Sequence, residues 1–169
     1  MRPALLALCA GLMMTAAGCA EARPESEEMV FVTEDDPAVV AAMAQAQETL
    51  PIFWRLHEAP PPGYSEFAVK VGLPTVSRDG EEHIWVFDVV REPDGGRGTL
   101  ANPPDDLGDL RYGSLVTFKD EQVSDWQYEK GGKLYGHFTT RALMDQWNEV
   151  QRAEGRERLS PQPLEAGVQ

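Results

Sequence analysis

The stretch Val123-Ser-Asp-Trp-Gln-Tyr-Glu-Lys-Gly-Gly-Lys-Leu-Tyr-Gly-His-Phe138 decides the fold class. It predicts two strands, residues 123–129 and 133–138, in which successive side chains point to opposite faces. Gly131-Gly132 between them is typical of a tight hairpin turn. Two strands joined by so short a turn pair antiparallel.

Further strands are predicted upstream of this hairpin. Residues 67–72 alternate apolar and polar or small side chains, which indicates a half-buried strand. Residues 83–90 carry apolar side chains at both odd and even positions, which favours a central strand. Asp94-Gly95-Gly96 is a hairpin signal that leads into residues 98–101, and residues 115–118 form another strand.

Helices are predicted on both sides of the strands. Residues 35–37 (Asp-Asp-Pro) start the first helix, because Asp is a favoured N-cap and Pro suits the first helical position. Pro51 predicts a break and a second, short helix. A last helix is capped at residues 139–140 and ends at Gly155. The class is therefore α+β: a curved antiparallel sheet of about five or six strands with an N-terminal and a C-terminal helix packed on it.

Net charge limits the classes of partner. The chain has 169 residues with 15 Lys and Arg against 28 Asp and Glu, which gives a net charge of −13. Nucleic-acid binding needs clustered Lys and Arg, so no nucleic acid is expected. Adhesion to an anionic lipid surface by charge alone is disfavoured for the same reason.

The first twenty residues resemble a secretory signal. Met1-Arg2 is a short positive start, and residues 3–20 carry no charge. Residues 16–19 (Ala-Ala-Gly-Cys) resemble the lipobox of bacterial lipoproteins, in which the signal is cut before the Cys and the Cys carries lipid. Cleavage near Ala20 or Ala22 by an ordinary signal peptidase is the alternative. In the lipoprotein interpretation Cys19 is the predicted lipidation site, since Cys9 lies inside the signal.

This signal leads to a division of the chain and a location. We expect a lipoprotein signal peptide over 1–18, a lipidated Cys and disordered acidic tether over 19–30, a single domain over 31–154 and a flexible tail over 155–169. The protein is expected to be exported and anchored to a membrane. In a Gram-negative cell the residue after the Cys favours the periplasmic face of the outer membrane.

Few motifs in the sequence carry chemistry. The chain has no Gly-x-Ser-x-Gly elbow, no P-loop and no dinucleotide-binding fingerprint. His57, His83 and His137 are far apart in sequence, so no metal site is expected, and no cofactor is implied.

The densest unusual stretch is residues 124–128, where two interpretations stay open. Trp126 and Tyr128 share a strand face and could form an aromatic recognition surface. Alternatively both rings belong to the core and Asp125 bonds to a nearby turn.

Several segments together resemble the YegJ-like bacterial proteins, a family catalogued as domain of unknown function 2314. The matching stretches are residues 49–51, 53–54, 67–70, 82–86, 100–103, 124–128, 132–134, 136 and 139–141. The chain departs from the family pattern at Phe87, Gln127 and His137. At the position of His137 the family tends to have Gly or another residue. The resemblance covers about residues 38–143 and implies one module. Some members occur beside ankyrin repeats, which implies interaction rather than metabolism.

The resemblance directs attention to a set of candidate binding residues rather than to an activity. They are Lys70, Trp85, Asn102, Asp125, Trp126, Tyr128, Lys133 and Arg141. The leading hypothesis is a non-catalytic, membrane-anchored binding module with a protein partner. In it, Trp126 and Tyr128 provide contact area, and Lys70 and Arg141 hold an anionic group.

Two other classes of function stay open. In an enzyme, such as a hydrolase, His83 would be the general base, Asp125 would orient it, and Lys70 or Arg141 would stabilise charge. In an immunity or inhibitor protein, an acidic surface with Asp105, Asp106 and Asp109 would cap a basic toxin.

Overall fold

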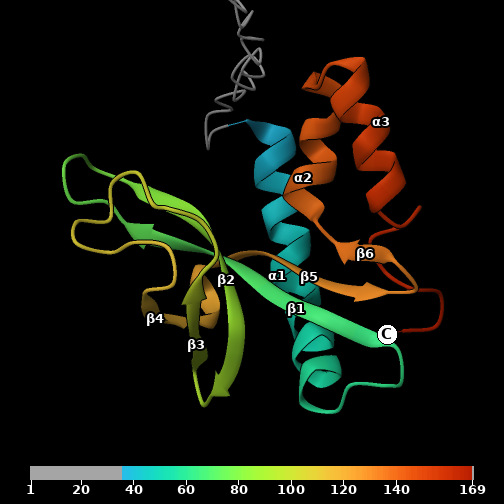
Figure 1. Cartoon of the computed structure of the whole chain (residues 1–169), viewed down its shortest axis with the longest axis horizontal. Helices are drawn as coiled ribbons and strands as arrows, with labels where there is room; N and C mark the ends of the chain where they lie inside the picture. Colours follow the sequence, from blue (N-terminus) through green and yellow to red (C-terminus); the bar gives the residue numbers. More distant parts are fainter. Residues whose placement is uncertain (1–35, 169) are drawn as a thin grey trace, which may run out of the picture.

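The computed structural model describes residues 36–168, so the predicted signal peptide, Cys19 and the acidic tether lie outside the described residues. Six strands form one open antiparallel sheet in the order β4-β3-β2-β1-β5-β6 (Figure 1). Their bounds are β1 Tyr64–Pro74, β2 Glu81–Glu92, β3 Gly95–Leu100, β4 Leu115–Lys119, β5 Val123–Lys130 and β6 Lys133–Gly136.

Helices precede and follow the sheet, so the α+β prediction is confirmed. The helical segments are α1 Pro37–Glu58, the 3₁₀ turn η1 Asp120–Gln122, α2 Phe138–Leu143, the 3₁₀ turn η2 Met144–Gln146 and α3 Glu149–Arg158. Figure 1 shows α1 running across the sheet, with α2 beside its N-terminal half. None of the helices within residues 36–168 has the length and apolar character needed to cross a bilayer.

The N-terminal helix is one element rather than the two that Pro51 predicted. Asp36 caps it as expected, since its Oδ1 accepts a hydrogen bond of 2.8 Å from the Ala38 N–H. Pro51 lies inside the helix and faces solvent, while Leu50 and Phe53 on either side of it are buried. Packing of this apolar stripe therefore outweighs the hydrogen bond that Pro51 cannot donate.

The C-terminal helix is broken where the sequence predicted one continuous helix. His137, with φ of 54°, precedes α2, and η2 separates α2 from α3. Gly155 lies within α3 instead of ending it. Its lack of a side chain leaves room for the Trp147 ring, since a Cβ there would come within 2.8 Å of that ring. The expected domain boundary after residue 154 falls inside that helix.

Residues after α3 pack on the sheet, where we expected a flexible tail. Leu159 and Ser160 are buried, and Leu159 forms a parallel bridge with Leu134 of β6. Glu165 forms an ion pair with Lys130 and accepts a hydrogen bond from the Tyr64 hydroxyl. This segment covers the β6 edge of the sheet, which would otherwise present unpaired backbone groups.

One face of the sheet makes the core with α1. Val69 of β1 lies opposite Val86 on β2 and Trp126 on β5, and all three are fully buried. The Trp126 indole N–H also donates a 3.1 Å hydrogen bond to the Ala46 carbonyl of α1. Residues directly opposite in an antiparallel pair share a face, so this row defines the helix-covered side.

Replacing Pro51 by Ala tests whether the proline strains α1. Pro51→Ala restores an N–H that can bond to the Gln47 carbonyl, and Pro is about 3 kcal/mol less favourable than Ala inside a helix. We expect the free energy of unfolding in urea to rise by about 1–3 kcal/mol. An unchanged or lower value would mean that Pro51 does not strain α1.

Candidate functional site

A second row of side chains lies on the face of the sheet away from α1. Lys70 of β1 pairs with Trp85 on β2 and with Asp125 on β5, so the three side chains share one face. Each of them is next in sequence to a residue of the buried core row, which consists of Val69, Val86 and Trp126. Because successive residues of a strand point to opposite faces, the three side chains point away from α1. Asp125 is fully buried, whereas Lys70 and Trp85 are half-buried. Three of the predicted binding residues therefore do meet.

Asp125 is the anchor of α2. Its Oδ1 accepts hydrogen bonds from the backbone N–H of Trp126 (2.8 Å) and Phe138 (3.0 Å). Its Oδ2 accepts from the N–H (2.9 Å) and the hydroxyl (2.6 Å) of Thr139. Burial raises the pKa of the Asp125 carboxyl, and these four hydrogen bonds oppose that effect. The carboxylate thus satisfies first-turn donors of α2 that would otherwise be unbonded.

Trp126 and Tyr128 are core residues, so the hypothesis that they form a recognition surface is wrong. Both side chains are fully buried. The Trp126 ring packs against Phe53 and Phe138, and the Tyr128 ring stacks on Tyr135. The structure decides for the second of the two interpretations that the sequence left open.

His137 lies beside the row formed by Lys70, Trp85 and Asp125, called the Lys70 row below, and the sequence did not predict this position. Its imidazole lies against the Trp85 indole, with the ring centres 5.0 Å apart. Its Nδ1 lies 3.1 Å from the Thr140 hydroxyl, and its buried Nε2 has no hydrogen-bond partner within residues 36–168. In the sequence, His137 stood out only as a position where the chain departs from the pattern of the family that it resembles.

The environment of His137 is positively charged. Burial of the imidazole is the main cause that lowers the pKa of His137 to about 4. The positive charges of Arg141, Arg158 and Lys70 lower it further. Burial also lowers the pKa of the Lys70 ammonium, and the charge of Asp125 opposes that shift. His137 is therefore a neutral imidazole at pH 7.

Arg141 holds the C-terminal segment instead of presenting its charge to a partner. Its guanidinium donates to the carbonyls of Gly136 (2.8 Å) and Ser160 (2.8 Å), and to the Ser160 hydroxyl (3.0 Å). Burial lowers the pKa of Arg141, and Asp125 opposes this. The predicted role of Arg141 as an anion ligand is thus replaced by a structural one.

Two other predicted binding residues lie elsewhere. Lys133 stands at the start of β6, where its ammonium donates to the Glu157 carbonyl. Asn102 is exposed on the loop after β3. Neither has a contact with the Lys70 row among those that the described residues make.

The predicted pair of His83 and Asp125 is not organised as an acid–base couple. His83 Nδ1 lies 2.8 Å from the Ser124 hydroxyl. The Asp125 oxygens are occupied by the donors of α2 described above. Within residues 36–168, no group of three or more His, Cys, Asp or Glu side chains is arranged to hold a metal ion.

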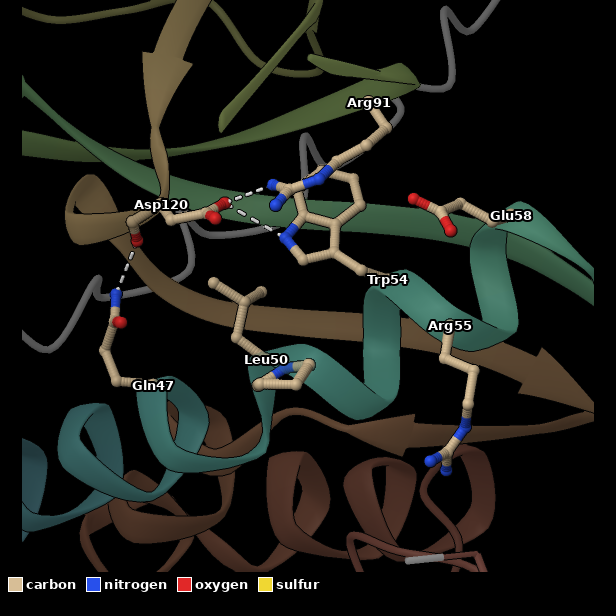
Figure 2. A pocket seen from close by; sticks show the side chains of 8 residues that line it. Gln47, Leu50, Trp54, Arg55, Glu58, Arg91 and Asp120 are labelled. Atoms are coloured by element: carbon tan, nitrogen blue, oxygen red, sulfur yellow. Dashed lines mark hydrogen bonds and ion pairs between the residues drawn. The ribbon is translucent and has the colours of Figure 1, made fainter. Parts of the chain in front are cut away.

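A separate groove of about 460 Å³ runs along α1. Figure 2 shows the Arg91 guanidinium above the Trp54 indole, with Asp120 bonded to both. Asp120 Oδ1 accepts hydrogen bonds from Arg91 (2.6 Å) and Trp54 Nε1 (3.0 Å), and Gln47 donates to the Asp120 carbonyl (2.7 Å). These contacts connect α1 to β2 and η1, which gives the groove a structural explanation.

Comparisons with known proteins identify a family without an assigned activity. The model of a family described as an uncharacterised protein conserved in bacteria (DUF2314) matches residues 36–159. A putative ankyrin repeat protein of Neisseria meningitidis is 32% identical over 73% of this chain and 51% of its own length. The uncharacterised protein YegJ of Escherichia coli is 32% identical over 55% of this chain and 60% of its own length. No solved structure matches the chain.

Removing the Asp125 carboxylate should destabilise the fold. Asp125→Ala leaves several buried donors without an acceptor, each costing about 1–3 kcal/mol. Thr139→Val removes one of the same hydrogen bonds and should cost only about 1 kcal/mol. Urea unfolding of both variants measures the difference. Equal losses would show that Asp125 does not act through all four bonds.

The stability of the domain should depend on pH through His137. The pKa of His137 is about 4 in the fold, against an ordinary value of 6.5. The stability that the neutral ring provides is therefore complete above pH 6.5 and is lost as the pH falls towards 4. His137→Asn, which tolerates the left-handed backbone, should remove that part of the loss. Unfolding experiments on both proteins from pH 7 to pH 4 test this, and parallel curves would contradict it.

Proposed function

The chain belongs to the DUF2314 family of bacterial proteins, and we propose that it is a non-catalytic binding module held on the cell envelope by lipid on Cys19. The proposed contact surface is the polar face of the sheet, with Trp85, Lys70 and His137 at its centre. The partner is a protein that this surface recognises.

The observation that carries the proposal is the half-buried Lys70 beside the Trp85 ring. Lys70 lies beside Trp85, and the Trp85 ring lies against His137. No ion pair to Lys70 occurs within residues 36–168. The charge of Asp125, its cross-strand neighbour, favours the ammonium, but burial outweighs this effect and lowers the pKa of Lys70. A half-buried cation that is compensated only in part is costly. An anionic group on a partner would provide that compensation.

The aromatic residues beside Lys70 support a binding surface further. Trp85 and Phe87 follow each other on one side of β2 and both remain half-buried, unlike the fully buried Val86 between them. Large aromatic side chains at the centre of an interface contribute strongly to association. The ankyrin-repeat context of the Neisseria relative agrees with a role in protein contacts.

The hydrolase alternative finds less support in the geometry. It requires Asp125 to orient His83, whereas the hydrogen bonds of the Asp125 carboxylate cap α2. The inhibitor alternative relies on the acidic loop after β3. There Asp106 already accepts hydrogen bonds from Ser77, and Glu82 accepts from the backbone of residues 105 and 106.

Site-directed cross-linking in the native membrane tests the contact surface. A photoreactive residue replacing Phe87 should link the full-length protein to a partner, whereas one replacing the exposed Thr117 on β4 should not. Lys70→Met should abolish the link from position 87, and Lys119→Met, a matched change on the far edge of the sheet, should leave it intact. Equal linking from both positions, or links that survive Lys70→Met, would refute the surface.

The lipid anchor is tested separately. Cys19→Ser removes the only thiol at the predicted lipidation site. We expect the protein to move from the membrane fraction to the soluble envelope fraction, because buried acyl chains contribute about 0.8 kcal/mol per CH₂. Retention of Cys19→Ser in the membrane fraction would contradict the anchor.

A further inference from the structure

We infer that the corner formed by Lys70 and His137 binds an oxyanion, a carboxylate or phosphate group, and that the imidazole of His137 is one of its ligands. This inference rests on the surface described under the proposed function and names the chemistry that this surface recognises.

Positive charge is concentrated at this corner of a strongly acidic chain. Lys70, Arg141 and Arg158 all lie near enough to His137 to affect its protonation. The whole chain carries a net charge of −13. Within the described part of the chain, neither Lys70 nor Arg158 forms an ion pair, and the hydrogen bonds of Arg141 go to carbonyls and the Ser160 hydroxyl. Three positive charges therefore act on His137, and the negative charge of Asp125 acts on two of them, Lys70 and Arg141.

His137 provides a second, independent observation. Its Nε2 is buried without a hydrogen-bond partner in residues 36–168, although buried polar atoms are nearly always bonded. In the tautomer whose Nδ1 accepts from the Thr140 hydroxyl, Nε2 carries the proton and is a hydrogen-bond donor. An oxyanion is the group that accepts from both Nε2–H and the Lys70 ammonium.

The backbone of His137 agrees with a ligand role. Its φ of 54° lies in the left-handed region, which Gly adopts freely and His adopts at a cost. Such strained positions concentrate at binding sites, because the surrounding structure must hold them. Here the strained residue turns its ring onto Trp85. Binding at Nε2 should therefore also change the environment of the Trp85 indole.

Ion titration of the full-length protein in a nonionic detergent tests the inference. Sodium phosphate and sodium acetate would be added at constant ionic strength, with the His137 ring followed by NMR. We expect saturable binding of one or both ions and a pKa of His137 that rises above its free value of about 4, because the bound anion favours the protonated ring. Acetate alone assigns a carboxylate ligand, and phosphate alone a phosphate ligand. Absence of saturation by either ion would overturn the inference.

Three variants make the test specific. Lys70→Met should weaken binding by about tenfold or more, whereas Lys119→Met should not change it. His137→Asn, which keeps the left-handed backbone, should weaken binding by a similar factor, with the fold verified by thermal unfolding. Binding that is unaffected by Lys70→Met or by His137→Asn, or equally weakened by Lys119→Met, would refute the site.

The outcomes separate this inference from the proposed function. If cross-linking from position 87 depends on Lys70 but no ion binds, the binding surface stands and the oxyanion site is wrong. If an ion binds at Lys70 and His137 but no partner is linked, the oxyanion site stands and the proposed function is wrong.

Discussion

Two adjacent residues of β5 hold the main elements together. Trp126 points into the core, where its indole N–H bonds to the Ala46 carbonyl of α1. Asp125 points the other way and accepts four hydrogen bonds, from its neighbour and from the first turn of α2. Because successive side chains of a strand point in opposite directions, this dipeptide bonds to two helices, to α1 through Trp126 and to α2 through Asp125. Gly136 of β6 must be Gly, because a Cβ there would collide with the Trp126 carbonyl.

This arrangement gives the two faces of the sheet different tasks. The face under α1 is closed by apolar and aromatic side chains that have no access to solvent. The opposite face keeps Lys70, Trp85 and His137 half-buried. The core on the other face of the sheet holds the strands that carry these side chains. The side chains themselves are not part of that core. Such a scaffold can place a few charged groups accurately for recognition.

The residues that line the groove beside α1 serve to hold the fold together. Arg91, Trp54 and Asp120 bond to one another there and connect α1 to the β2 and η1 side of the sheet (Figure 2). Their charges are paired within the groove. At the Lys70 corner, neither Lys70 nor Arg158 forms an ion pair within residues 36–168, and this difference separates the candidate site from the Arg91–Asp120 pair of the groove.

Local sequence patterns were sufficient to predict the class and most strands, because alternation, turn residues and the Asp36 cap act over a few residues. They misplaced the helix boundaries at Pro51 and Gly155, where packing against distant residues outweighs the local preference of Pro and Gly. Whether Trp126 was core or surface also depended on α1, about eighty residues upstream. The position of His137 beside Lys70 and Trp85 arises only when three strands and the turn before α2 come together, since no spacing in the sequence encodes that contact. The sequence by itself therefore determined the α+β architecture, and the tertiary structure decided which polar residues share a site.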